Sequence, residues 1–203
     1  MDYSTKRDSI PGAVANFESQ WKRMPDMVWL GEEYWANRLQ DWCIKDGCLE
    51  CLVYGQNRNV HLLTHQVGSS GNHFTTSVSL KLNGEAIDKF DGEIGFTLGL
   101  KGRYPGYQSA CITGKGINVG VNHSGKLFAG TETSGAMVDR SQLIKGVRLV
   151  VSVEGLDLRL EAQNIDGSKI ASFESRISDA EQLTGNIALL VDSSNQLEDD
   201  ETW

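Results

Sequence analysis

Residues 147–162 alternate between apolar and polar side chains, and the alternation changes phase at a single turn, Glu154-Gly155. A period of two is that of a β-strand with one buried face, because successive side chains point to opposite faces of a sheet. The phase change predicts an antiparallel hairpin whose polar residues, such as Arg159, form a charged ladder in solvent. The apolar positions are Val147, Leu149, Val151 and Val153 before the turn, and Leu156, Leu158, Leu160 and Ala162 after it.

Short apolar or alternating runs between Gly, Asn and Asp turns recur along the chain, and 22 of its 203 residues are glycine. This pattern is typical of antiparallel sandwiches and barrels. The run Ile94–Leu100 is apolar throughout, which predicts a strand covered on both faces. The other predicted strands are 42–44 and 49–54, which form a hairpin, and 60–67, 74–82, 108–113, 116–121, 126–129, 170–175 and 187–191.

Two short helical segments are also predicted. A helix over about 11–23 follows from apolar residues spaced by four, three and four positions, and Ser178 opens a capping-box pattern that ends at Gly185. We therefore predict an extension of residues 1–27 with a short N-terminal helix, followed by one all-β domain over 28–203. A final Trp203 after an acidic loop looks like the start of a truncated strand, so we expect the natural protein to continue beyond it.

The formal net charge is −8, which makes the chain a poor candidate for binding nucleic acid or an anionic membrane. No apolar run approaches the roughly 20 residues of a membrane span. The sequence as given also begins without a signal-peptide pattern. We therefore expect neither nucleic acid nor a membrane span among the partners.

The four cysteines, Cys43, Cys48, Cys51 and Cys111, leave three alternatives open. The spacing of Cys48 and Cys51 is that of a metal or redox motif, but zinc needs a second pair of ligands and a redox pair needs a helix N-terminus. Cys43 and Cys48 flank a turn, which would allow a disulfide across it. Buried free thiols are the simplest interpretation.

Residues 29–42, WLGEEYWANRLQDW, hold three tryptophans among charged and amide side chains. The motifs DGCLEC, RNVHLLTHQ, GFTLGLKGRYPGYQSA, GKGINVGV, SGKLFAG and LTGNIALL follow in order. Together, over residues 28–192, they resemble the N-terminal region of PhoD-like (alkaline phosphatase D) proteins. The resemblance implies a concanavalin A-like antiparallel β-sandwich, or jelly roll, that precedes a metallophosphatase domain. The metal-binding motifs of that domain are absent from this sequence, so its activity is not implied for this chain.

A weaker resemblance, to 3-keto-disaccharide hydrolase-like sandwiches, covers Trp42 to Leu52. Two interpretations of the segment 29–42 stay open. In the first, Trp35 and Trp42 close the core where the first strand crosses between the sheets, and the neighbouring polar side chains form a buried network. In the second, those polar side chains face a ligand. They are Glu32, Glu33, Asn37 and Arg38.

Patterns for catalysis are weak. Sandwich glycosidases place acids at alternate positions of one strand, whereas Glu154, Asp157 and Glu161 mix both parities and span a turn. His61 and His65 share a strand face but would lie about 13 Å apart, too far for one metal, which favours surface or half-buried histidines. No nucleophile elbow, phosphate-binding loop or zinc-protease motif occurs.

The best binding candidate is the Gly/Pro loop of residues 101–108, because aromatic faces stack on sugar rings and arginine adds directed hydrogen bonds. The alternative is that its tyrosines pack back on the sandwich rim. The predicted ligand-binding residues are Arg103, Tyr104 and Tyr107, with Lys115 and His123 at the same edge. Calcium is the metal that the resemblance suggests, but its ligands stay open. Oxygen ligands are available at Asp88, Asp91 and Glu93, or at Asp199 and Asp200.

We therefore expect a non-catalytic, lectin-like module, periplasmic or extracellular, that binds a glycan or glycoconjugate or supports an adjoining phosphatase domain. The alternative is a sugar hydrolase or lyase with carboxylates on the concave face of a sheet. Two carboxylates about 5–9 Å apart in a cleft would favour that enzyme. A third hypothesis is a purely structural sandwich whose faces are covered by a partner domain.

Overall fold

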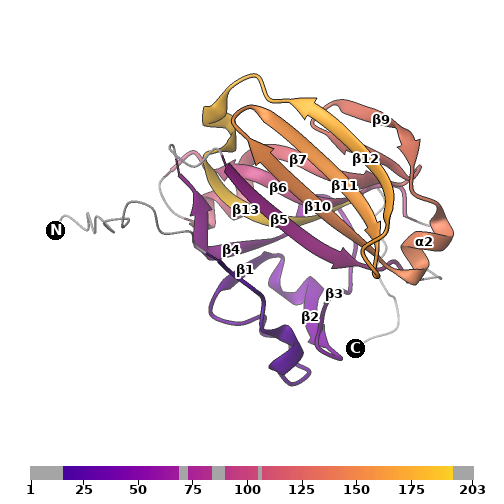
Figure 1. The fold of residues 1–203 in the computed structure, drawn as a ribbon. Helices are drawn as coiled ribbons and strands as arrows, with labels where there is room; N and C mark the ends of the chain where they lie inside the picture. Colours follow the sequence, from indigo (N-terminus) through magenta and orange to yellow (C-terminus); the bar gives the residue numbers. More distant parts are fainter. Residues whose placement is uncertain (1–15, 69–72, 84–89, 105–106, 194–203) are drawn as a thin grey trace.

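In the computed structural model, two antiparallel sheets lie face to face and a two-stranded hairpin stands beside them (Figure 1). The structure describes residues 16–68, 73–83, 90–104 and 107–193, without the side chains of Tyr107 and Gln108. The predicted all-β sandwich is confirmed. In spatial order the larger sheet holds β1 (Tyr34–Asn37), β4 (Arg58–Val67), β13 (Gly185–Asp192), β6 (Glu93–Lys101), β7 (Lys115–Asn122), β8 (Lys126–Ala129) and β9 (Glu132–Met137). The smaller sheet holds β12 (Lys169–Arg176), β11 (Asp157–Asn164), β10 (Val147–Glu154) and β5 (His73–Leu80), and the hairpin consists of β2 (Trp42–Lys45) and β3 (Cys48–Cys51).

The smaller sheet contains the hairpin that the alternating residues predict. β10 and β11 pair in register from Val153↔Leu158 to Val147↔Asn164, and β5 and β12 flank them. The alternating apolar side chains of β10 and β11 turn to one side and are buried, whereas those of β5 are half-buried. The opposite face carries the predicted charged ladder, with ion pairs Arg159–Glu161, Arg159–Glu174 and Arg176–Asp157.

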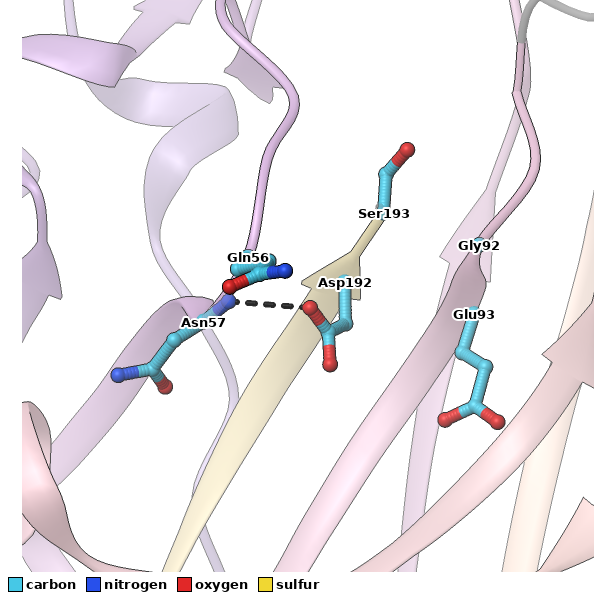
Figure 2. Close-up of a pocket in the computed structure, with 6 residues that line it drawn as sticks. All are labelled: Gln56, Asn57, Gly92, Glu93, Asp192 and Ser193. Carbon is cyan, nitrogen blue, oxygen red and sulfur yellow. Dashed lines mark hydrogen bonds between the residues drawn. The ribbon is translucent and has the colours of Figure 1, made fainter. Parts of the chain in front are cut away.

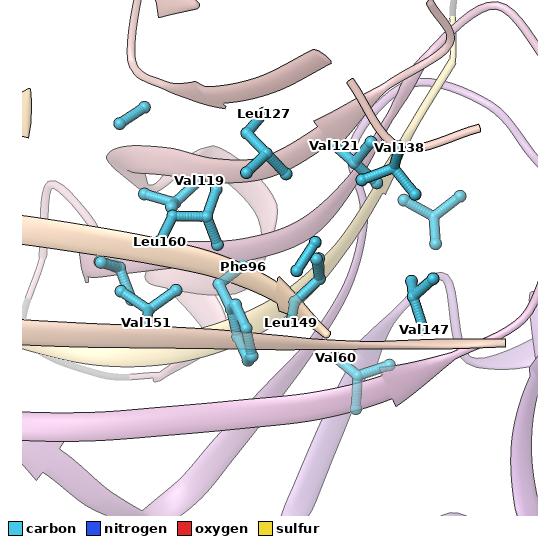
Figure 3. Packing of buried hydrophobic residues seen from close by; sticks show 14 of the residues in the cluster. Val60, Phe96, Val119, Val121, Leu127, Val138, Val147, Leu149, Val151 and Leu160 are labelled. Carbon is cyan, nitrogen blue, oxygen red and sulfur yellow. The ribbon is translucent and has the colours of Figure 1, made fainter. Parts of the chain in front are cut away.

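The core fills the space between the two sheets (Figure 3). Burial of each large apolar side chain contributes about 1.5–3 kcal/mol, which makes this layer the main source of stability. Because side chains alternate along a strand, the inward residues also determine which residues the larger sheet presents on its outer face. The inward residues include Val60, Phe96, Val119, Val121 and Leu127 of the larger sheet, and Val147, Leu149, Val151 and Leu160 of the smaller one.

A buried ion pair ties the β2–β3 hairpin to the larger sheet. Asp41, in the 3-10 turn η2 (Leu39–Asp41), lies 2.5 Å from Nε of Arg58 at the start of β4. Both side chains are almost fully buried, at 5–6% exposure. The distance between the two charged groups is that of an ion pair, but the angle at Nε does not meet the requirement for a hydrogen bond. Arg58 also donates from Nη1 to the carbonyl of Gln56 over 2.8 Å, so it fixes the chain just before β4.

The tryptophan segment fulfils only part of its first interpretation. Trp42 is buried, and its indole N–H donates to the carbonyl of Asn37. Trp35 is half-buried and lies on the outer face of the larger sheet. Glu32 and Arg38 are exposed, so the predicted buried network of Glu32, Glu33, Asn37 and Arg38 does not form. The buried ionic contact of this region is instead Asp41–Arg58.

Several predicted elements differ from the structure. Residues 108–113, predicted as a strand, belong to helix α1 (Tyr107–Thr113). A six-residue window with small side chains does not separate the helical period from the strand period. The predicted helix over 11–23 is absent at residues 16–20 and ends in the 3-10 turn η1 (Trp21–Arg23), while residues 11–15 lie outside the described part. The capping-box segment agrees with its prediction, since it forms one helical turn, the 3-10 turn η3 (Ala180–Leu183), which ends before Gly185.

The elements that the sequence did not predict include the edge strands β1 and β9, the 3-10 turn η2 and helix α2 (Arg140–Lys145). The capping box of α2, in which Asp139 and Gln142 bond reciprocally, begins the helix, and Gly146 ends it at a φ of 108°. Within the described residues, no helix combines the length and the apolar composition that crossing a membrane requires.

We expect Arg58→Met to lower the free energy of unfolding by about 3–5 kcal/mol, because it leaves the buried Asp41 carboxylate without its countercharge. The double variant Arg58→Met/Asp41→Leu should recover most of that loss. Equilibrium urea unfolding measures both. The surface pair Lys45–Glu50, with 4.0 Å between charges, is the control, and its removal should cost less than about 1 kcal/mol. A double variant as unstable as the single one would contradict this account.

Candidate functional site

The outer face of the larger sheet carries polar side chains in rows that cross the strands. Cross-strand partners share a face, so the register of β13, β6 and β7 places Asp192, Glu93 and Asn122 in one row at one end of the sheet. Asn57 continues this row beside β13, because its backbone N–H donates to Oδ1 of Asp192 over 3.0 Å. The next row is Asn37, Asn59, Leu190, Gly95, Gly120 and Phe128, and the third is Trp35, His61, Ala188, Thr97 and Asn118.

The first row opens into a cavity of about 440 Å³ (Figure 2). Glu93 and Asp192 are direct partners on two central strands, and Figure 2 shows both carboxylates extending from the same side of the sheet. Such partners have Cβ atoms about 4.5–5.5 Å apart. The residues that line the cavity are Gln56, Asn57, Gly92, Glu93, Asp192 and Ser193.

Gly92 lets the chain pass close to the end of β13. A Cβ atom added there would lie 1.7 Å from the carbonyl oxygen of Asp192, so only glycine fits. Beside it, Ser193 donates its hydroxyl to Asp91. The backbone at the cavity wall is therefore determined by a glycine and by a side-chain hydrogen bond.

Burial and a neighbouring charge raise the pKa of Glu93. Desolvation is the larger cause, the charge of Asp192 adds to it, and a hydrogen bond with Asn118 opposes both. Asn118 lies two rows farther along the sheet, and its Oδ1 accepts from the Thr97 hydroxyl over 2.8 Å. Gly95 and Gly120 occupy the row between them, so no side chain of that row separates Glu93 from Asn118. The two glycines therefore allow Glu93 to extend along the sheet.

The structure does not bring the five sequence-predicted binding residues together. Arg103 and Tyr104 follow the last residue of β6, and Lys115 pairs with that residue, Lys101. His123 follows the other end of β7, where its N–H donates to the carbonyl of Gly92 over 2.8 Å. Lys115 and His123 are eight residues apart along an extended strand, about 26 Å, so they do not line one edge. Of the four predicted residues whose side chains are described, only His123 lies near the cavity.

Arg103 and Tyr104 form a small exposed unit of their own. The guanidinium carbon of Arg103 lies 5.6 Å from the centre of the Tyr104 ring, within cation–π distance. Tyr104 is 64% exposed, so it does not pack back on the rim. The side chain of Tyr107 lies outside the described part, and its predicted role stays a prediction.

The predicted calcium ligands are not assembled among the described residues. Asp91 accepts from Ser193, Glu93 belongs to the cavity, and Asp88, Asp199 and Asp200 lie outside the described residues. Within the part that is described, no group of three His, Cys, Asp or Glu side chains has metal-binding geometry. The cysteines are free thiols, with Cys111 buried, Cys43 and Cys51 half-buried and Cys48 exposed.

His61 differs from the surface or half-buried position predicted for the histidines, because it is fully buried. Burial lowers its pKa to about 4, so the ring is neutral at physiological pH. His65 is half-buried, with its Nδ1 2.9 Å from the Thr64 hydroxyl and its ring beside that of Phe17. A strand pattern gives the face of a histidine but not what covers that face.

Comparison with known proteins returned no match to any family model, curated protein or solved structure. The resemblance to PhoD-like proteins therefore stays a prediction. The sequence patterns did not indicate Asp192 or Asn57, and Glu93 was predicted only as a calcium ligand. One available signal was that Glu93 and Asp192 each adjoin an apolar run of predicted strand, Ile94–Leu100 and Ile187–Val191.

We expect Glu93→Gln to raise the melting temperature at pH 7–8. A carboxyl whose folded pKa lies above its unfolded value binds its proton more tightly when folded, so its ionisation destabilises the fold as pH rises. The gain should disappear below about pH 4, where Glu93 is protonated in both states. Thermal unfolding across this range tests the sign, with the exposed Glu174→Gln as control. A Glu93→Gln variant less stable than wild type at pH 8 would contradict the pKa assignment.

Proposed function

We propose that this chain is a glycan-binding module and that it binds sugar in the cavity on the outer face of the larger sheet. The observation that carries the proposal is the row Asn57, Asp192 and Glu93, which surrounds an open cavity at the ends of neighbouring strands. Concave sites with a few convergent polar groups are the usual form of small-ligand sites.

The chemistry of this row suits neighbouring hydroxyl groups. A sugar hydroxyl both donates and accepts, an ionised carboxylate accepts strongly, and an amide does both. Gln56 and Asn57 are exposed beside the half-buried Asp192, so they are available to a ligand at the mouth of the cavity. Each Glu93 or Asp192 oxygen could accept from one hydroxyl of a sugar.

Charge narrows the class of glycan. Two carboxylates in one row, in a chain of net charge −8, repel phosphate, sulfate and uronic acid groups. We therefore propose a neutral glycan. Arg103 and Tyr104 lie at the other end of the sheet, in a separate exposed loop, so they are not part of the proposed site.

The same two carboxylates favour a second candidate, a glycoside hydrolase. A general acid must keep its proton to higher pH than an ordinary carboxyl, and burial together with Asp192 raises the pKa of Glu93 in that direction. Asp192 would then serve as the ionised base or nucleophile. A lyase would use the pair differently but would also release sugar fragments.

The roles that rest on resemblance alone are support of an adjoining phosphatase domain and a periplasmic or extracellular location. Both are compatible with glycan binding, because an accessory sandwich can bind a ligand and contact another domain at once. Both roles remain proposals that are supported by the sequence motifs alone.

Retention on immobilised laminarin, xylan, mannan and dextran, with analysis of released fragments, tests both candidates. We expect wild type to be retained on at least one of them. Asp192→Asn and Glu93→Gln should weaken the Kd by about 10- to 100-fold, because each removes a hydrogen bond to a charged group. Retention without fragments supports the binding module, and fragments that disappear with either substitution support the hydrolase.

Two matched variants make this test specific. Glu174→Gln removes an exposed carboxylate from the smaller sheet and should leave retention unchanged. Tyr104→Ala should also leave it unchanged if the cavity is the site. Loss of retention in Tyr104→Ala alone, with Asp192→Asn unaffected, would move the site to the loop and overturn the proposal.

A further inference from the structure

Helix α1 lies over part of the outer face of the larger sheet, in contact with β1, β4 and β6. Its Ala110 packs on Leu100 and Ala188. Ala188 is the direct partner of His61 on β4, and Trp35 is the partner of His61 on the other side. The row Trp35–His61–Ala188 therefore lies beneath the helix.

This covered region leaves polar atoms without hydrogen bonds. Both ring nitrogens of His61, and Oδ1 of Asn59 in the adjacent row, are buried and have no partner among the described residues. His61 is fully buried and Asn59 is 4% exposed. Buried polar groups in proteins are almost always paired, and an unpaired one destabilises the state that buries it. The unpaired atoms of His61 and Asn59 therefore destabilise the closed position, in which α1 covers this part of the sheet.

The helix itself is weakly held. It has seven residues, a length that is marginal without tertiary contacts. The described apolar contact between α1 and the larger sheet is made by the small side chain of Ala110. One hydrogen bond adds to it, in which the side-chain amide of Asn57 donates to the carbonyl of Ile112 over 3.1 Å.

We propose that α1 is an acid-sensitive cover that opens when His61 is protonated and so adds Trp35, Asn59 and His61 to the exposed outer face. In the open position the imidazolium is hydrated, whereas in the closed position it has no hydrogen-bond acceptor among the described residues. Opening of α1 does not depend on the nature of any ligand, so this proposal can be tested independently of the proposed glycan binding.

The described groups that face His61 do not offset its charge. Its own strand contributes Asn59, β1 contributes Trp35, and β13 and β6 contribute Ala188 and Thr97. The thiol on α1 is that of Cys111, and burial raises its pKa to about 12, so it stays neutral. Among the described side chains, burial is the only resolved cause of the lowered pKa of His61.

The sign and size of the effect follow from linkage. The pKa of His61 is about 4 in the closed state and would return to its ordinary 6.5 when the ring is hydrated. Protonation therefore favours the open state as pH falls below 6.5. Between pH 8 and pH 5 the equilibrium constant for opening should rise about 30-fold.

Cys111 provides the measurement, because its thiol is buried at α1 while Cys48 is exposed. The full chain is labelled with a dithiodipyridine reagent, and peptide mass spectrometry gives the ratio of the two labelling rates, which cancels the pH dependence of thiol ionisation. Hydrogen exchange of the β10–β11 amides reports global unfolding. We expect the Cys111/Cys48 ratio to rise about 30-fold from pH 8 to pH 5 while the β10–β11 amides stay protected.

His61→Phe should abolish the rise, because an apolar ring of similar shape neither titrates nor leaves polar atoms unpaired. His73→Phe, at an exposed histidine of the smaller sheet, is the matched control and should retain it. NMR titration of the His61 ring in wild type keeps the test decisive if His61→Phe does not fold. A flat labelling ratio, an equal rise in His61→Phe, opening together with the β10–β11 amides, or titration of His61 near pH 6.5 with α1 closed would each overturn the proposal.

Discussion

The packing of two sheets across one apolar layer is the constraint on which the rest of this molecule depends. Side chains alternate along a strand, so the burial of Phe96 and Val119 against the smaller sheet determines which residues of β6 and β7 lie on the outer face. Glu93 and Asp192 face outward because Ile94 and Val191, their neighbours in sequence, face the core. The cavity is thus a consequence of core packing combined with register, and it needs no element of its own.

The same alternation explains what sequence could predict. Strands with a strong period, such as β10 and β11, were predicted together with their buried face, and the charged ladder followed from it. The edge strand β1 was not predicted, because the tryptophans and charged residues around Tyr34–Asn37 follow neither the helical nor the strand period. Helix α1 was assigned wrongly because its small residues suit either structure, and tertiary contacts with Leu100 and Ala188 decide the outcome.

The candidate site was less predictable than the fold for a physical reason. Its residues are distant in sequence, and Asn57, Glu93 and Asp192 meet only through the pairing of β4, β13 and β6. Spacing along the chain holds no information about that order. Residue type misled as well, because the exposed Arg103 and Tyr104 have the composition of a sugar-binding loop, whereas the cavity lies at the opposite end of the sheet.

Two titratable groups on the outer face, Glu93 and His61, lower the stability of the fold in opposite directions of pH change. Burial raises the pKa of Glu93, so its contribution to stability falls as pH rises, and burial lowers the pKa of His61, so its contribution falls as pH decreases below 6.5. Glu93 lies on β6 and His61 on β4, and neither side chain belongs to the core between the two sheets. A face selected only for stability would replace both with residues that do not titrate, and perturbed pKa values are typical of surfaces where binding or conformational change takes place.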